Sequence, residues 1–126
     1  HHLMHGARFL AIGMNRPFKE GERWHLDAGP FIKALSYASG REPEIIGKPG
    51  PILFQEAANA MQLNARDILM IGDDAEADVN GAIATGMQGA LVRTGKYQPG
   101  DEHTLDAGTR VFDDLKDLVQ QLWPLE

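Results

Sequence analysis

The residues best suited to chemistry lie where an apolar segment runs directly into three acids. Ile68–Ile71 is apolar, Gly72 follows, and Asp73, Asp74 and Asp78 come shortly after it. Carboxylates gathered at the end of a buried strand repel one another unless a cation lies among them. Hard oxygen ligands suit Mg²⁺, which keeps several waters and shares the phosphate oxygens of a substrate. The stretch therefore predicts a divalent-metal site, with Mg²⁺ as the favoured ion.

The three acids differ in the roles that their positions suggest. Asp73, nearest to the strand end, is the favoured metal ligand. Asp74 is well placed to cap a following helix, because an Asp there accepts a backbone N–H, and this role is favoured over a metal contact. Asp78 falls one helical turn after Asp74 and can orient the cation or its waters. An ordinary surface acid explains Asp78 equally well, so Asp74 and Asp78 are supporting candidates only.

A lysine comes one strand and one helix before the acids. Gly47-Lys48-Pro49 directly follows the short apolar segment 44–46. Ligands of α/β proteins bind outside the carboxyl ends of parallel strands, so Lys48 and the acids are expected at one edge of the sheet. A cation there balances the charge of a phosphoryl group. The alternative is a surface lysine with its stem on apolar neighbours, but the pairing with the acids favours a catalytic role for Lys48.

A second cationic loop follows the next apolar strand. Thr94-Gly95-Lys96-Tyr97 can line the same crevice, although a plain loop is the favoured interpretation. The chain contains no Gly-x-Gly-x-x-Gly phosphate loop and no Ser/His/Asp order. Lys48 and the acidic stretch therefore carry the functional interpretation, and no residue is assigned to substrate binding.

Alternating apolar and amphipathic segments must position these residues. The expected strands cover residues 8–13, 44–46, 68–71, 88–92 and 110–112. The expected helices cover residues 29–39, 51–61, 75–85 and 113–123. Short apolar strands separated by amphipathic helices are typical of a parallel sheet covered on both faces. The predicted fold class is therefore α/β with three layers.

The first third of the chain has a different pattern of apolar and polar residues. Residues 16–23 are polar and hairpin-like, and the apolar Trp24-His25-Leu26 precedes the first long helix. We predict a division at Glu42-Pro43, into residues 1–42 and residues 43–126. Four large aromatic side chains are expected in the core: Trp24, Phe31, Phe54 and Trp123.

Bulk composition excludes several functions. The 126 residues are 43% hydrophobic and 24% charged, as in a globular protein, and no apolar run reaches the length of a bilayer span. A net charge of −6 argues against nucleic acid as a partner, since phosphate backbones select basic surfaces. The chain has no cysteine, which excludes disulfides and thiolate metal sites. We expect a cytoplasmic protein with no membrane association.

Taken together, the motifs resemble those of haloacid dehalogenase (HAD) superfamily phosphatases. Gly47-Lys48-Pro49 and Ile71-Gly72-Asp73-Asp74 occur in that family's order, and the similarity continues through Asp78-Val79-Asn80-Gly81-Ala82. The subfamily with the closest resemblance, IIA, includes phospholysine phosphohistidine inorganic pyrophosphate phosphatase and 4-nitrophenylphosphatase-like enzymes. The resemblance covers residues 7–123 and is most specific over residues 44–97.

The resemblance implies roles for the candidate residues within a Rossmann-like HAD core. Lys48 would steady the nucleophile and the phosphoryl group, Asp73 would bind Mg²⁺, and Asp78 would hold the lysine or the metal's waters. Residues 1–42 would be the distal part of an α/β cap domain, and residues 43–126 the C-terminal part of the hydrolase core. A small phosphorylated substrate and a homodimer formed through the cap are also implied.

Two motifs of the family are missing, an Asp-x-Asp motif and a Ser/Thr motif that precedes the cap. The family's reaction needs an Asp-x-Asp motif that supplies an aspartyl nucleophile, and this sequence contains none. We therefore expect a Mg²⁺-dependent phosphatase in the intact protein, and no turnover by this portion alone. One alternative is a non-catalytic metal- or phosphate-binding regulatory α/β protein. Another is a receiver-like phospho-acceptor, which is disfavoured because its acidic pair belongs on the first strand.

Overall fold

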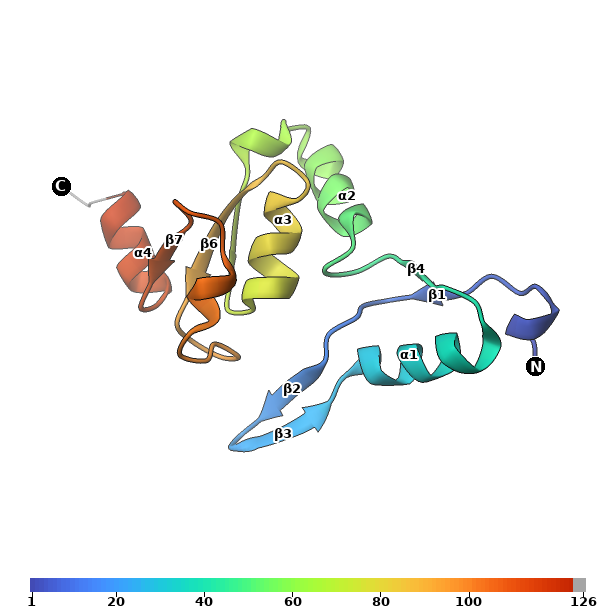
Figure 1. The fold of residues 1–126 in the computed structure, drawn as a ribbon. Coiled ribbons are helices and arrows are strands. Elements are labelled where there is room, and N and C mark those ends of the chain that lie inside the picture. The colour runs from blue at the N-terminus through green and yellow to red at the C-terminus, as the bar shows by residue number, and fades with distance from the viewer. Residues whose placement is uncertain (124–126) are drawn as a thin grey trace.

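The computed structural model describes residues 1–123, which form two parts (Figure 1). The larger part, from residue 47 onward, is built on a parallel sheet of three strands in the order β5-β6-β7. These strands are β5 (Leu69–Gly72), β6 (Gln88–Val92) and β7 (Arg110–Phe112). Ile71 pairs with Ala90, and Leu91 pairs with Val111. The carboxyl ends of all three strands therefore lie at one edge of the sheet, as predicted.

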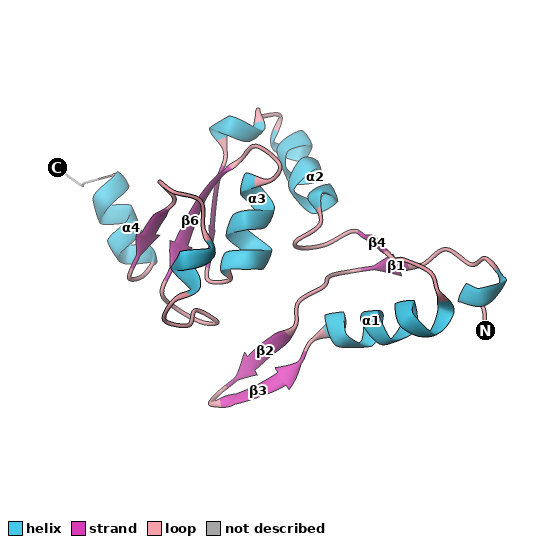
Figure 2. Cartoon of the chain, viewed as in Figure 1, coloured by secondary structure: helices cyan, strands magenta, loops and turns pink. Residues whose placement is uncertain are grey.

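Helices cover both faces of this sheet (Figure 2). They are α2 (Pro51–Met61), α3 (Gly81–Ile83) with the helical turns before it, and α4 (Leu115–Leu122). On one face Val79 shares a buried cluster with Leu91, and on the other Leu118 shares one with Phe112. The predicted three-layer, Rossmann-like α/β core is thus confirmed. Within residues 1–123, every helix is too short or too polar to traverse a lipid bilayer.

The segment after β5 differs from the single α-helix that the sequence predicts over residues 75–85. Ala75–Asn80 is a π-helix, and only Gly81–Ile83 is α-helical. The wider turn is shown by a hydrogen bond from the Val79 N–H to the carbonyl of Asp74, five residues earlier, at 3.3 Å. Over so few turns, hydrophobic periodicity does not distinguish the two kinds of helix, because both place the same apolar residues inward. Turns of this kind are frequent at functional sites.

The N-terminal part, residues 1–46, contains a strand pair, a hairpin and one long helix. Its elements are a 3₁₀ turn (Leu3–His5), β1 (Leu10–Ala11), β2 (Pro17–Glu20), β3 (Arg23–Leu26), α1 (Ala28–Ser39) and β4 (Glu44–Ile45). β2 and β3 form the antiparallel hairpin that the polar pattern indicated. β1 is shorter than the predicted strand and pairs in parallel with β4. The strand expected over residues 44–46 therefore lies outside the three-stranded sheet, contrary to the sequence prediction. β4 lies beyond residue 42, and the division into residues 1–42 and 43–126 stays a prediction.

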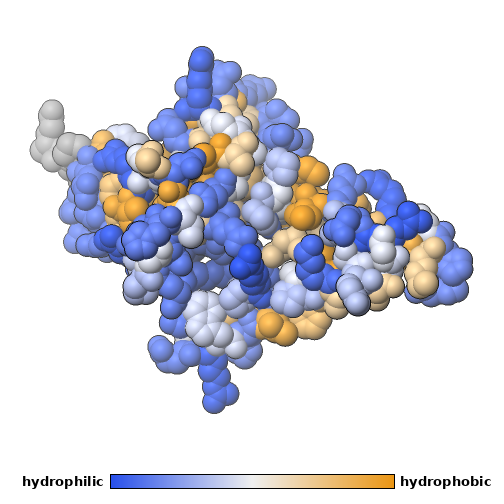
Figure 3. Space-filling view, viewed as in Figure 1, coloured by the Kyte–Doolittle hydropathy of each residue, from blue (hydrophilic) through white to orange (hydrophobic). Residues whose placement is uncertain are grey.

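The aromatic residues expected in the core are mostly not there. Phe54 is buried, but three others are exposed: Trp24, Phe31 and Trp123. α1 turns Ile32 and Ser36 inward rather than Phe31, and the Ser36 hydroxyl donates a hydrogen bond to Glu42 Oε1 at 2.9 Å. Apolar residues occur on two sides of α1, so periodicity alone does not say which side packs. Apolar surface therefore remains along this helix (Figure 3).

Candidate functional site

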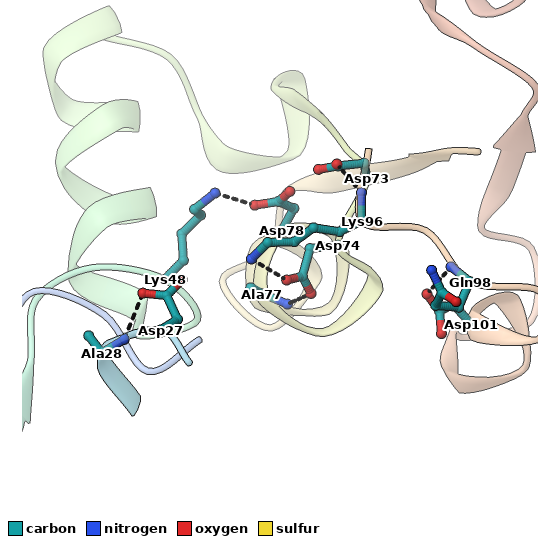
Figure 4. Close-up of polar contacts among 10 residues, drawn as sticks. All are labelled: Asp27, Ala28, Lys48, Asp73, Asp74, Ala77, Asp78, Lys96, Gln98 and Asp101. Atoms are coloured by element: carbon teal, nitrogen blue, oxygen red, sulfur yellow. Dashed lines mark hydrogen bonds and ion pairs between the residues drawn. The ribbon is translucent and has the colours of Figure 1, made fainter. Parts of the chain in front are cut away.

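Lys48 and Asp78 form an ion pair where the two parts meet (Figure 4). Lys48 follows β4, Asp78 lies in the π-helix, and Lys48 Nζ is 2.5 Å from Asp78 Oδ1. Asp78 is only 4% exposed, whereas the Lys48 side chain is 36% exposed. A carboxylate removed from water needs a charged or hydrogen-bonding partner, and Lys48 supplies it. The structure thus brings two of the predicted site residues into contact.

Backbone packing holds both members of this pair. The Lys48 carbonyl accepts a hydrogen bond from Met14 N–H at 3.1 Å, which ties the loop after β4 to the loop after β1. A Cβ on Gly72 would clash with the Asp78 side chain. β5 therefore ends on a glycine that leaves room for Asp78 beside the strand end.

Asp73 extends from the end of β5 and is held by a neighbouring loop. Its Oδ2 accepts a hydrogen bond from the Lys96 backbone N–H at 2.7 Å. Within residues 1–123, no hydrogen bond reaches the other carboxylate oxygen, Oδ1. Asp73 also lines two cavities, of about 360 and 180 Å³, that it shares with residues of the β2–β3 hairpin. A free carboxylate oxygen beside open space suits a hard cation that keeps several waters.

Both side-chain oxygens of Asp74 have partners. Oδ1 accepts a hydrogen bond from Ala77 N–H at 2.8 Å, so Asp74 caps the helical segment as predicted. Oδ2 lies 3.5 Å from Lys96 Nζ, and both of these side chains are about three-quarters buried. Asp74 thus has a structural role, and its support of a metal site stays a prediction.

The three acids have separate partners in the structure, and their predicted roles at a metal site stay predictions. Asp73 meets a backbone N–H, Asp74 meets the ammonium of Lys96, and Asp78 meets that of Lys48. Across residues 1–123, no cluster of three or more His, Cys, Asp or Glu side chains is arranged to hold a metal ion. Lysine ammonium groups therefore balance Asp74 and Asp78, whereas no ammonium group among the described residues pairs with Asp73, and its Oδ1 accepts no hydrogen bond there.

Lys96 belongs to this group, although its sequence context favoured a plain loop. β5 and β6 are adjacent and parallel, so the loop after β6 lies beside the acids that follow β5. The sequence did not reveal which strands are neighbours in the sheet. The available indication was a Gly-Lys pair immediately after an apolar strand, the same arrangement that identified Lys48.

A polar network anchors the far side of the Lys96 loop. The Tyr97 hydroxyl donates a hydrogen bond to Glu102 Oε2 at 2.8 Å, and Arg93 lies 3.6 Å from the other oxygen of Glu102. The hydrogen bond to Glu102 raises the pKa of Tyr97. The backbone N–H of Glu102 and the Tyr97 hydroxyl together lower the pKa of Glu102. The loop is therefore fastened at both ends, to Asp73 and to Glu102.

A larger cavity separates the N-terminal part from the start of the π-helix. Its volume is about 470 Å³, and its walls include Asn15, Arg16, Lys33, Asp74 and Glu76. Arg16 and Glu76 approach each other across the junction at 3.5 Å, with both side chains exposed. The cavity is large enough for a small organic molecule and lies beside the acids.

Known proteins resemble this chain in sequence and in fold. The sequence profile of the HAD-hydrolase-like family matches residues 45–118, more than half of the chain. Phospholysine phosphohistidine inorganic pyrophosphate phosphatase of Bos taurus is 47% identical over 94 residues, which are 75% of this chain and 35% of that protein. The chain thus spans about a third of the length of this curated relative and of its counterparts in other vertebrates.

Solved structures share the fold. The p-nitrophenyl phosphatase from Archaeoglobus fulgidus matches with a TM-score of 0.81 and 31% identity, over 94% of this chain and 48% of that one. A glycerol phosphate phosphatase from Mycobacterium tuberculosis, in complex with magnesium, matches with a TM-score of 0.76 and 28% identity, over 92% of this chain and 36% of that one. By its profile match and its fold, the chain belongs to the HAD-hydrolase-like family, as the sequence motifs implied.

Proposed function

We propose that this chain supplies the lysine and the metal ligand of a Mg²⁺-dependent phosphatase centre that works through an aspartyl-phosphate. The observation that carries the proposal is the ion pair that brings Lys48 to the end of β5. Asp78 contacts the Lys48 ammonium and packs against Gly72, the residue before Asp73. This edge of an α/β sheet is where ligands bind. Relatives named as phosphatases support the proposal.

Asp73 is proposed as the Mg²⁺ ligand. Mg²⁺ is usually bound through one or two carboxylates, with waters and substrate phosphate oxygens completing its shell, and the free Oδ1 of Asp73 fits that requirement. The magnesium complex of the similar glycerol phosphate phosphatase supports the choice of ion. When bound, Mg²⁺ would withdraw charge from the phosphoryl oxygens.

Lys48 is proposed to neutralise charge on the phosphoryl group during transfer. Asp78 holds the ammonium in position, and burial of the carboxylate limits competition from water. About a third of the Lys48 side chain stays exposed, and we expect a substrate to approach the ammonium from that side. Asp74 would support the site by fixing the start of the π-helix.

The nucleophile would come from outside these 126 residues. The sequence contains no Asp-x-Asp motif, and the aspartyl-phosphate route needs that carboxylate. We therefore expect no turnover by this chain alone, and turnover by a longer protein in which such a motif is present. The second candidate is a non-catalytic protein that binds metal or phosphate in the same place.

Further parts of the proposal concern the surroundings of the site. The substrate would be a small phosphorylated compound, whose leaving group the 470 Å³ cavity could receive. Residues 1–42 would act as the distal part of a cap domain over the core formed by residues 43–126. Exposed apolar side chains along α1, such as Phe31 and Leu35, support a homodimer contact through that cap. A cytoplasmic location stays a prediction.

Hydrolysis of 4-nitrophenyl phosphate by the natural full-length protein tests the proposal. We expect turnover with Mg²⁺, none after chelation, and a loss of at least a hundredfold in Lys48→Ala and in Asp73→Ala. Lys116→Ala, which changes an exposed lysine on α4, should keep full activity. Full activity in both site variants would refute the proposal. Mg²⁺ or phosphate binding without hydrolysis would support the second candidate instead.

A further inference from the structure

We propose that the loop Thr94–Tyr97 is a positioning element for Asp73. In this view the Lys96 backbone N–H fixes one oxygen of the Asp73 carboxylate and thereby aims the other, Oδ1, at the cation. The inference rests on the proposed role of Asp73 as the Mg²⁺ ligand. It goes further by assigning a role to a loop that the sequence left without one.

The first support is the hydrogen bond itself. Lys96 N–H donates to Asp73 Oδ2 at 2.7 Å (Figure 4), which is short for an N–H···O bond and typical of a charged acceptor. A carboxylate with one oxygen held in this way can rotate little about its side-chain bonds. Groups that orient a metal-binding side chain through a hydrogen bond commonly contribute 10- to 100-fold to metal affinity.

The second support is the fit between Gly95 and the carboxylate. Gly95 has a φ of +53°, and a Cβ built on it would overlap Asp73 Oδ2. The backbone of the loop therefore lies directly against the oxygen that it binds. Any side chain at position 95 would displace the carboxylate or the loop, whereas glycine allows both to stay.

The third support is the rigidity of the loop. Tyr97 N–H donates to the Thr94 carbonyl at 3.0 Å, which closes the turn. The Tyr97 ring packs against the cluster that contains Leu91, and its hydroxyl binds Glu102. A donor held by a fixed turn can impose its position on Asp73, which a mobile donor could not do.

The Lys96 side chain acts separately from its backbone. Its Nζ lies 3.5 Å from Asp74 Oδ2, so the ammonium balances the acid next to Asp73 and does not contact Asp73 itself. Removing the ammonium leaves the backbone N–H in place. The two contributions of Lys96 can therefore be distinguished by substitution.

Mn²⁺ binding to the 126-residue chain tests the inference without relying on activity. Mn²⁺ serves as a paramagnetic probe for the Mg²⁺ site, and its broadening of backbone amide signals near residue 73 reports both affinity and location. We expect Gly95→Ala to weaken Mn²⁺ binding at least tenfold. Gly40→Ala is the matched control, because Gly40 has a similar φ of +65° but no atom within 4 Å of an added Cβ. It should stay within twofold of the parent.

Two further variants separate the possible failures. Lys96→Ala should keep the affinity within threefold or increase it, since it removes only the ammonium, and a tenfold loss would overturn the inference. Asp73→Ala should abolish localised broadening. If Asp73→Ala has no effect, the proposed metal role of Asp73 fails. If Asp73→Ala abolishes binding but Gly95→Ala does not weaken it, the positioning inference alone fails.

A measurement on the Lys96 amide keeps the test decisive if Gly95→Ala does not fold. The amide proton of Lys96 should move upfield in Asp73→Ala, because it loses a charged acceptor. An unchanged Lys96 amide would show that the hydrogen bond is absent in solution and would overturn the inference.

Discussion

Replacing Lys48 by Met should destabilise the chain, because it leaves Asp78 buried without a partner. Met keeps most of the lysine stem but removes the ammonium that lies 2.5 Å from Asp78 Oδ1. Breaking a buried ion pair by removing one member costs about 3–5 kcal/mol. The Lys48 side chain is 36% exposed, however, so water already screens the pair. We therefore expect a loss of about 2 kcal/mol, or roughly 8 °C in Tm.

A double-mutant cycle isolates the interaction. Lys48→Met, Asp78→Asn and the double variant are compared with the parent by urea unfolding, which yields a free energy of unfolding for each. Asn keeps the shape of the buried side chain but carries no charge. The double variant should therefore lose about 1–2 kcal/mol less than the sum of the single variants.

The control is Lys116→Met on α4, an exposed lysine that should change the free energy of unfolding by less than about 0.5 kcal/mol. If the coupling between Lys48 and Asp78 is indistinguishable from zero, then Lys48 does not compensate the buried carboxylate. The physical argument that links this lysine to the end of β5 would then be wrong.

Three other changes test separate features. Asp74→Ala removes the cap of the π-helix and should lower the free energy of unfolding by about 1 kcal/mol in urea; no change would argue against the cap. Leu118→Ala should cost about 3 kcal/mol in the same assay, since Leu118 is fully buried, whereas exposed Leu115→Ala should cost less than about 0.5 kcal/mol. The pKa of Glu102 is lower in the folded chain than its ordinary value of 4.5, so the ionised carboxylate stabilises the fold fully above pH 4.5. This stabilisation is lost as the pH falls through the lowered pKa. In Tyr97→Phe, an NMR titration should show the midpoint of Glu102 rising toward 4.5, and an unchanged midpoint would contradict the assigned cause.

The order of elements in the core was predictable because each has a strong local pattern. Short apolar strands alternate with amphipathic helices, and each strand ends at a glycine or a polar residue. The burial of α1 was not predictable. Its apolar residues lie on two sides, and the choice of Ile32 over Phe31 depends on contacts with distant segments. The wider turn of the π-helix also has no recognisable signature in the sequence.

The candidate site was predictable where it consists of side chains. Asp73 stands directly after β5, at the edge where ligands of parallel sheets bind. Lys48 follows β4, which pairs with β1 outside that sheet, and it reaches the same edge through its ion pair with Asp78. The role of Lys96 was missed because its contact with Asp73 is made by a backbone N–H, and every residue except proline has that donor. The partner of each acid also depends on which strands are neighbours in the sheet, and this order could not be predicted from the sequence.

The hydrogen bond from the main chain at position 96 has a consequence for how related sequences can diverge. Any residue except proline supplies the donor at position 96, whereas every side chain is excluded by the overlap at position 95. Homologues that keep an acid at the position of Asp73 should therefore keep glycine at position 95, whereas the residue at position 96 should vary. In such an alignment the invariant residue would be the one without a side chain, and the residue that makes the bond would look dispensable.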